Sequence, residues 1–404
     1  MAVGTPETPE LHPVPGVSIG TACAGIKRWT RDDLVVFALP AGGTCAATFT
    51  RNAFCAAPVV VAKTHLPQNP RWLIVNAGNA NAGTGAQGME DALSTCRALA
   101  ALTGGTEAQV LPFSTGVIGE YLPLDKIAAA LPKAVADLAE DHWHKAMHAI
   151  MTTDTRPKGA SRVIDIDGHS VTVTGIAKGA GMIHPNMATM LSFIATDARI
   201  DQPTLQACLS AAVERSFNRI TVDGDTSTND ACVLMASGLS SAPVIDQDGP
   251  HYAAFAVAVE EVCGQLAAAI VRDGEGASKL MRIQVSGAQD AEEAHRVANT
   301  VALSPLVKTA FFASDPNWGR ILAAVGRAGC ENLDIDRITI DLNGVRIVEN
   351  GGRASSYTEN AGQAAMAPEE ITVVIALGRG NADCEVLTCD FSFDYVKINA
   401  EYRT

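Results

Sequence analysis

The stretch Lys178-Gly-Ala-Gly-Met-Ile-His-Pro-Asn-Met-Ala-Thr-Met-Leu191 decides how this chain is organised, because a glycine-rich turn leads from one strand pattern directly into another. The first strand pattern covers residues 170–177. The second begins at Thr189 and carries apolar residues on both of its alternating faces as far as residue 195, which is typical of a strand buried on both sides. We therefore expect the hydroxyl of Thr189 to lie at the edge of a buried sheet.

Thr189 stands where cleavage of the chain would generate a nucleophile. A threonine hydroxyl alone is a poor nucleophile, and a neighbouring amine is one of the few groups that activate it. Cleavage of the peptide bond before Thr189 supplies such an amine, because the α-amino group of the residue, with an ordinary pKa of about 8, then becomes free. The pattern alone leaves a simpler interpretation open, in which Thr189 only begins a strand.

The charge balance excludes two classes of partner. The chain has 404 residues, with 30 Lys and Arg against 44 Asp and Glu, and its formal net charge is −14. An acidic surface repels the phosphates of nucleic acids and of anionic lipid headgroups. We therefore expect neither nucleic acid nor a membrane surface as a partner. The length suits two or three domains of about 150 residues each.

Cysteine usage and the N-terminal composition favour a cytoplasmic location. The ten cysteines are scattered, with no C-x-x-C pair, as in proteins of a reducing compartment. Residues 1–16 contain Glu7, Glu10 and four prolines but neither a basic nor a long apolar segment, so we expect no signal peptide. No apolar stretch approaches the roughly 18 residues of a membrane span. We therefore predict a cytoplasmic protein.

Helical and strand patterns alternate along the whole chain. Apolar spacing predicts helices over residues 124–131, 135–150 and 251–271, and apolar runs of strand length lie between the helical patterns. The dipeptide Asn343-Gly344 separates two such runs, and both of its residues tolerate the positive φ angles of a tight hairpin. The last third therefore contains antiparallel sheet, and mixed α/β layers are the predicted architecture.

Several motifs together resemble one enzyme family. The stretch KGAGMIHPNMATML resembles the self-processing signature of the ornithine acetyltransferases of arginine biosynthesis, also called glutamate N-acetyltransferases. Further motifs similar to that family follow one another along essentially the whole chain, and this agreement favours Thr189 as a nucleophile. They are FTRN (49–52), STGVIGE (114–120), MTTDT (151–155), DGDTSTND (223–230), SDPNWGR (314–320) and DYVKINAEYRT (394–404).

The resemblance implies a fold and a processing event. It implies an α/β, or α+β layered, protein with antiparallel sheets between helices, in which residues 1–278 form the catalytic domain. Residues 279–404 are then a smaller C-terminal α/β domain that contributes its tail to the active site. Self-cleavage between Ala188 and Thr189 gives an α chain of residues 1–188 and a β chain of residues 189–404, assembled as an α2β2 heterotetramer.

The resemblance also implies roles for individual residues. Thr189 matches the acetyl-accepting nucleophile, and Thr115 with Gly116 matches the pair that stabilises the oxyanion of the reaction intermediate. A hydroxyl and a backbone N–H on a glycine-containing turn are chemically suited to that task. The family's substrate-binding positions fall here on Thr152, Lys178, Thr189, Glu275, Asn399 and Thr404, with the lysine available for a carboxylate and the glutamate for an ammonium group.

The implied activity is an acetyl transfer through a covalent enzyme intermediate. The acetyl group moves from N2-acetylornithine to Thr189 and then to glutamate, and some members of the family also accept acetyl-CoA as a co-substrate. No metal or bound cofactor is required. The alternative from the same nucleophile is an N-terminal-nucleophile aminopeptidase or amidohydrolase, which passes the acyl group to water.

Two weaker signals favour other classes of function. His142, His144 and His148 lie close together in the sequence, but no H-E-x-x-H motif accompanies them, so we expect a solvated helix surface rather than a metal site. The glycine-rich segments 78–85 and 274–279 lack the spacing of nucleotide-binding loops. We therefore predict neither a metal nor a nucleotide cofactor.

Overall fold

The chain is described here by a computed structural model, which covers residues 2–5, 8–27, 30–184 and 190–401. Its contacts divide it into two compact units. The larger unit comprises residues 7–218 and 225–270, and the smaller unit comprises residues 1–6, 219–224 and 271–404. The domain boundary placed after residue 278 stays a prediction.

The larger unit contains two β-sheets, each with one parallel pair of strands among antiparallel neighbours. Four strands form the first sheet, in the order β1 (Ser18–Ala22), β2 (Leu34–Ala38), β4 (Trp72–Asn79) and β5 (Val110–Val117). Five strands form the second, in the order β3 (Thr44–Phe49), β10 (Ala231–Ala236), β8 (Leu191–Thr196), β7 (His169–Lys178) and β6 (Lys158–Ile166).

The two sheets of the larger unit pack face to face through one apolar core. Every residue of β8 is buried, as the apolar pattern predicts for a strand covered on both sides. Phe193 lies at the centre of this core. Its ring stacks on Phe37 of the other sheet at a centroid distance of 5.1 Å and meets Phe113 edge-on at 5.2 Å. Side chains from both inner faces join them in the same cluster.

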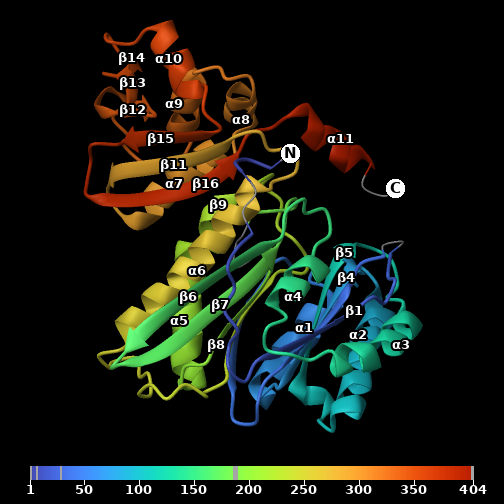
Figure 1. Cartoon of the computed structure of the whole chain (residues 1–404). Helices are drawn as coiled ribbons and strands as arrows, with labels where there is room; N and C mark the ends of the chain where they lie inside the picture. Colours follow the sequence, from blue (N-terminus) through green and yellow to red (C-terminus); the bar gives the residue numbers. More distant parts are fainter. Residues whose placement is uncertain (1, 6–7, 28–29, 185–189, 402–404) are drawn as a thin grey trace. The chain divides into compact units, whose positions relative to one another are not determined.

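Helices cover the outer faces of these sheets. α2 and α3 bury their apolar faces against the four-stranded sheet, and α5 and α6 run along the five-stranded sheet (Figure 1). The predicted layers of sheets between helices are therefore present. The helices of this unit are α1 (Ala57–His65), α2 (Gly85–Thr103), α3 (Leu124–Ala136), α4 (Trp143–Ala149), α5 (Gln202–Arg215) and α6 (Tyr252–Arg272), the last of which ends in the smaller unit.

α6 corrects the expectation that no segment is long and apolar enough to span a membrane. It has 21 residues, and an 18-residue window within it has a mean hydropathy of 1.7. Half of that window is buried, and Val262 and Leu266 of the helix pack closely over Gly175 of β7. α6 is thus long and apolar, and part of its apolar surface covers the five-stranded sheet.

The prediction of one helix over residues 135–150 is wrong. α3 continues through Pro132 to Ala136, because its buried face extends across the proline from Ile127 to Ala134. The chain then leaves the helical path, since Ala139 exchanges two backbone hydrogen bonds with Ile19 of β1, at 2.9 and 3.1 Å. A helix begins again only with α4.

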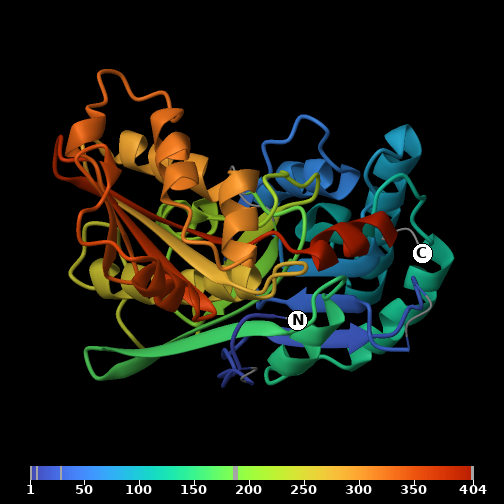
Figure 2. The same ribbon diagram turned by 90° about the horizontal axis from the view of Figure 1, so that it is seen from above.

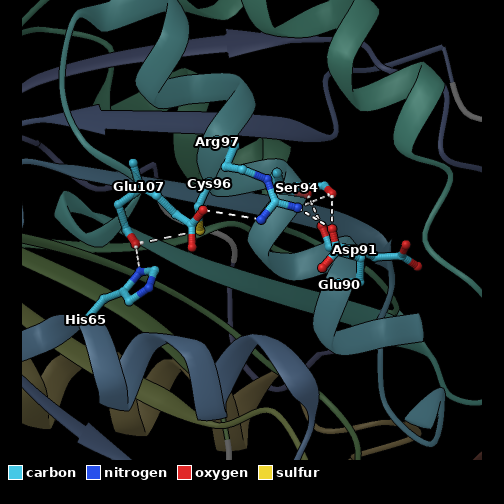
Figure 3. A network of polar contacts seen from close by, with 9 residues as sticks. His65, Glu90, Asp91, Ser94, Cys96, Arg97 and Glu107 are labelled. Atoms are coloured by element: carbon cyan, nitrogen blue, oxygen red, sulfur yellow. Dashed lines mark hydrogen bonds and ion pairs between the residues drawn. The ribbon is translucent and has the colours of Figure 1, made fainter. Parts of the chain in front are cut away.

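The exposed side of α2 carries a local polar network. Figure 3 shows Arg97 donating hydrogen bonds to Glu90, Ser94 and Glu107. The side chains of the two ion pairs are between 34% and 59% exposed, so each pair contributes at most about 1 kcal/mol to stability. This network therefore contributes modestly to the stability of α2, and its contacts do not indicate a reaction site.

The smaller unit is built on one mixed sheet. Its seven strands lie in the order β14 (Gly352–Arg353), β13 (Val345–Glu349), β12 (Thr339–Leu342), β15 (Glu370–Ala376), β11 (Leu280–Ala288), β16 (Ala382–Cys389) and β9 (Ile220–Thr221). The predicted hairpin joins β12 to β13, and its turn residues Asn343 and Gly344 have φ angles of +44° and +82°. This agrees with a tight turn that needs positive φ at both positions.

Helices complete the smaller unit. Buried side chains of α7 and α9 pack in the same apolar core as the inner face of the sheet. The terminal helix projects from one end of the sheet, and none of its residues is buried (Figure 1 and Figure 2). The helices are α7 (Ala291–Ala302), α8 (Pro305–Phe312), α9 (Trp318–Gly326), α10 (Glu359–Met366) and α11 (Phe393–Glu401).

Replacing Phe193 by alanine tests the packing of the two sheets. The substitution removes the ring that Phe37 and Phe113 contact, so the free energy of unfolding should fall by about 3–5 kcal/mol. Urea unfolding measures this change. Phe54→Ala is the matched control, because its side chain is 56% exposed, and it should change stability by less than about 1 kcal/mol. Equal losses in both variants would contradict a shared core.

Candidate active site

The nucleophile predicted from the sequence lies outside the described residues, and so do Ala188 and Thr404. The nearest described neighbour of Thr189 is Met190, and Met190 lines a small cavity of about 30 Å³ in the larger unit. The polar residues Thr115, Lys178 and Asp230 line the same cavity.

Two predicted site residues meet directly in this cavity. Thr115 comes from β5 in one sheet and Lys178 from the end of β7 in the other, and both are buried. The Nζ of Lys178 donates a hydrogen bond of 3.2 Å to the Oγ1 of Thr115. Because that oxygen accepts a bond from an ammonium group, the hydroxyl proton of Thr115 is left to donate elsewhere. This is the orientation that an oxyanion-stabilising hydroxyl needs.

Asp154 joins Lys178 to a third predicted residue, Thr152. The carboxylate of Asp154 is fully buried, and its Oδ1 accepts hydrogen bonds of 2.6 Å from both the Nζ of Lys158 and the N–H of Gly179. Its Oδ2 accepts a bond of 3.0 Å from the N–H of Thr152 and lies 4.0 Å from the Nζ of Lys178. Thr152 therefore meets the site through its backbone in this structure.

The surroundings of Asp154 keep it ionised. Burial by itself raises the pKa of a carboxyl group, but the positive charges of Lys158 and Lys178 and the hydrogen bonds to the carboxylate hold the pKa of Asp154 far below its usual range. The cluster thus pairs one carboxylate with two ammonium groups. Neither Asp154 nor Lys158 was singled out from the sequence, although Asp154 stands inside the quoted motif MTTDT.

Gly116 brings two strands unusually close at the turn after Thr115. Its φ angle is +134°, and a Cβ atom at this position would lie 2.2 Å from the carbonyl carbon of Gly78 on β4. Real Cβ atoms do not approach backbone atoms so closely, so only glycine fits here without moving β4 away from β5. The Thr115-Gly116 turn therefore has a fixed backbone path.

Asn229 holds the same turn from the loop before β10. Its Nδ2 donates to the carbonyl of Ser114 at 3.0 Å and to the carbonyl of Ala80 at 2.6 Å. The amide oxygen of Asn229 accepts a bond of 2.6 Å from the hydroxyl of Thr228. Asn229 is thus a positioning residue that sequence reasoning missed, and the motif DGDTSTND that contains it was the available signal.

Two further predicted residues meet in the smaller unit. The Nδ2 of Asn399 on α11 donates a hydrogen bond of 2.9 Å to the Oε2 of Glu275, whose side chain is buried. The loop of Glu275 also contacts the start of the tail, because the hydroxyl of Ser392 donates to the carbonyl of Gly276 at 2.6 Å. The C-terminal segment is therefore docked onto this loop.

The described residues contain no group of three or more His, Cys, Asp or Glu side chains arranged for a metal ion. In the histidine-rich segment, the Nδ1 of His148 lies 2.7 Å from the carbonyl of His144, and the Nδ1 of His142 lies 3.3 Å from a carboxylate oxygen of Asp137. These contacts link the histidines to their own helix and to its neighbouring loop.

Comparison with known proteins places the chain in a family. The model of the ArgJ family matches residues 18–404. The chain belongs to the ArgJ family. The ArgJ-family match confirms the resemblance to the ornithine acetyltransferases, and it favours the acetyltransferase over the aminopeptidase alternative.

Relatives with high identity carry the same family name. The arginine biosynthesis bifunctional protein ArgJ of Methylococcus capsulatus is 64% identical over 394 residues, which cover 98% of this chain and 97% of the relative. The protein of that name from Pseudomonas syringae pv. tomato is 55% identical over 405 residues and covers both chains completely. This ArgJ-family chain is accordingly an acyltransferase of arginine biosynthesis.

A solved structure supports the fold. The crystal structure of the arginine biosynthesis bifunctional protein ArgJ from Bacillus halodurans is similar with a TM-score of 0.51 and 42% sequence identity. The similarity covers 52% of this chain and 99% of that chain. The predicted α/β layered fold class of the ArgJ-family chain is thereby confirmed.

Replacing Asp154 by asparagine tests the buried ion cluster. The variant leaves Lys158 and Lys178 buried without their carboxylate, so stability at pH 7 should fall by about 3–5 kcal/mol. Asp141→Asn is the control, because that side chain is 76% exposed, and it should be nearly neutral.

The pH dependence of this loss has a defined sign. The folded-state pKa of Asp154 lies below its unfolded value of about 3.9, so its contribution is complete well above that pH and is lost as the pH falls through the folded-state pKa. In urea unfolding at a series of pH values, the wild-type advantage over Asp154→Asn should be constant from about pH 7 to 5 and shrink below about pH 4. An advantage that stays constant below about pH 4 as well would contradict the ion cluster.

Proposed function

We propose that Thr189 carries the acetyl group from N2-acetylornithine to glutamate in this ArgJ-family acetyltransferase. One observation carries the proposal. Lys178 donates to the hydroxyl of Thr115 in a cavity that Met190 lines, and Met190 is the residue directly after Thr189. A hydroxyl oriented to donate thus lines the same cavity as the residue that follows the nucleophile implied by the family resemblance.

Self-cleavage between Ala188 and Thr189 prepares the nucleophile in this proposal. It gives the β chain a new α-amino group with an ordinary pKa of about 8, close enough to neutrality to act as a base. The extent of the match to the Bacillus halodurans structure supports cleavage of the chain into two parts. That structure covers 52% of this chain with 99% of its own length, and a β chain of residues 189–404 has 404 − 188 = 216 of the 404 residues.

The first half of the reaction forms an acetyl ester. The hydroxyl oxygen of Thr189 attacks the acetyl carbonyl carbon of N2-acetylornithine, and the α-amino group of Thr189 takes the hydroxyl proton. The hydroxyl of Thr115 and the N–H of Gly116 donate to the oxyanion that forms. When the intermediate collapses, the carbon–nitrogen bond breaks, and the ornithine amine leaves with the proton.

The second half transfers the acetyl group. The α-amine of glutamate attacks the ester carbon and gives up a proton to the α-amino group of Thr189. The same donors stabilise the second oxyanion, and the Thr189 oxygen leaves and takes that proton back. The relatives are named bifunctional, and we propose acetyl-CoA as the second acetyl donor of this chain. The proposed steps use protein groups and the new N-terminus, with no metal or bound cofactor.

Five further residues are assigned to substrate binding. Lys178 offers an ammonium group to a substrate carboxylate, and Glu275 offers a carboxylate to a substrate ammonium group, with Asn399 already bonded to it. Thr152 and Thr404 supply hydroxyl groups for orientation. We propose that the processed enzyme is a cytoplasmic α2β2 heterotetramer, in keeping with a biosynthetic enzyme of small soluble substrates.

Thr189→Ala tests the nucleophile and the cleavage together. The variant lacks the hydroxyl that both steps need, so it should remain one full-length chain without transferase activity, whereas Thr189→Ser should retain part of each. Intact mass and N-terminal sequencing of the purified wild type should show two chains, the second beginning with Thr189. A single uncut chain with full activity would refute the assignment.

Assays of the purified wild-type enzyme also distinguish acetyl transfer from hydrolysis. With N2-acetylornithine as the donor, glutamate should be converted to acetylglutamate, and the initial rates should give the parallel lines of a double displacement. Release of acetate at the same rate with and without glutamate would instead support the amidohydrolase alternative.

Thr115→Ala tests the oxyanion assignment. Loss of an oxyanion donor typically lowers kcat by roughly 10²-fold or more, because the hydrogen bond strengthens only as charge develops. Thr115→Ser keeps the hydroxyl and should stay within about tenfold of the wild type. A large rise in KM at unchanged kcat in Thr115→Ala would show that the hydroxyl serves ordinary substrate binding.

A further inference from the structure

Asp230 is a buried carboxyl group in the candidate active site to which neither the motif analysis nor the proposed reaction gives a role. It ends the loop before β10, and the residue lines the same cavity as Thr115 and Lys178. The next residue, Ala231, donates its backbone N–H to the carbonyl of Met190 at 2.9 Å. The backbone therefore fixes Asp230 beside the beginning of the strand that follows Thr189. Only 2% of the residue is exposed.

The hydrogen bonds of Asp230 are incomplete for a carboxylate. The backbone and the side chain of Ser227 donate to it, whereas its Oδ2 is buried and has no hydrogen-bond partner among the described residues. An ionised carboxylate would leave that oxygen charged, desolvated and unpaired, which is strongly unfavourable. A protonated carboxyl group instead has an O–H that can act as a hydrogen-bond donor.

Electrostatics support the protonated form. Burial raises the pKa of Asp230 well above its usual range, and the hydrogen bonds from Ser227 and the charge of Lys178 offset that effect only in part. Within the described part of the chain, two titratable groups neighbour Asp230: Lys178 on β7, and Cys55, which precedes α1 in the sequence. Asp154 in turn neighbours Lys178. Asp154 already serves as a counter-charge to Lys178.

Thr115 and Asp230 line one small cavity. A polar group bound in that cavity would therefore lie next to both residues. If the oxyanion of the proposed reaction occupies this space, the neutral carboxyl group of Asp230 adds a second hydrogen-bond donor to that of Thr115, from a different segment of the chain.

We propose that the carboxyl group of Asp230 remains protonated in the active enzyme and donates its O–H to the oxyanion of the acetyl group, alongside the hydroxyl of Thr115. The proton stays on Asp230 throughout, and no bond to it forms or breaks. Because Asp230 is neutral, the positive charge of Lys178 remains available to bind a carboxylate of the substrate. The inference rests on the proposed function, because it places the reacting acetyl group in this cavity.

Asparagine and alanine at position 230 distinguish a neutral donor from a charged base. Asp230→Asn keeps the shape, the neutrality and a hydrogen-bond donor, so its kcat should stay within about fivefold of the wild type. Asp230→Ala removes the donor and should lower kcat by roughly 10- to 100-fold, with KM changed less than about threefold. Asp246→Ala, exposed and remote in the sequence, is the control and should behave as the wild type.

The pH profile gives a second readout. Ionisation of Asp230 at high pH would remove the donor and place a negative charge in the cavity, so the wild type should lose kcat on the alkaline side. Asparagine does not ionise, so Asp230→Asn should shift that alkaline loss to higher pH. An unchanged alkaline limb in Asp230→Asn, or an Asp230→Asn variant as slow as Asp230→Ala, would overturn the proposal, as would a fully active Asp230→Ala.

A measurement that does not depend on turnover can also be made on variants that are not cleaved. The infrared difference spectrum between the wild type and Asp230→Asn at neutral pH should contain the C=O stretch of a protonated carboxylic acid. A carboxylate signal in its place would overturn the proposal. Failure of the proposed function looks different, because the wild type itself would then form no acetylglutamate.

Discussion

The hydrogen-bonded carboxylate of Asp154 is the constraint on which the arrangement of the site depends. It binds the ammonium group of Lys158 and the backbone of Thr152 and Gly179, and it lies 4.0 Å from the ammonium group of Lys178. Removing two lysine charges from water is unfavourable unless a buried anion compensates them. Asp154 supplies that anion, so Lys178 can stay charged at the end of β7 and bond to Thr115.

The packing of two sheets explains why these groups meet. Thr115 lies near the end of β5 in one sheet, whereas Lys178 ends β7 in the other, and the aromatic contacts of Phe193 hold the two inner faces together. Residues that stand 63 positions apart in the sequence are thereby placed 3.2 Å apart at one end of the layers. Asn229 adds a third segment by bonding to the carbonyl of Ser114.

Patterns within a short window could be predicted from the sequence, and contacts between distant segments could not. The hairpin at Asn343-Gly344 and the buried strand after the glycine-rich turn follow from local rules of backbone and periodicity. The extended path at Ala139 follows from its pairing with Ile19, which no local pattern contains. The pairing of Lys178 with Thr115 likewise depends on the packed sheets, although the family resemblance already selects both residues.

The two buried acids of the larger unit show how environment separates chemically identical groups. Asp154 has two lysines and two backbone N–H donors around it, and these hold its pKa low, whereas for Asp230 the effect of burial on the pKa outweighs the hydrogen bonds of Ser227 and the charge of Lys178. Pairs of titratable groups whose pKa values are pushed apart are characteristic of active sites, because one then acts as a charge and the other as a donor. Asp154 can stabilise Lys178 as a fixed anion only if the second carboxyl does not compete for the same ammonium group. The unpaired oxygen of Asp230 is therefore consistent with a site that keeps one anion and one neutral acid.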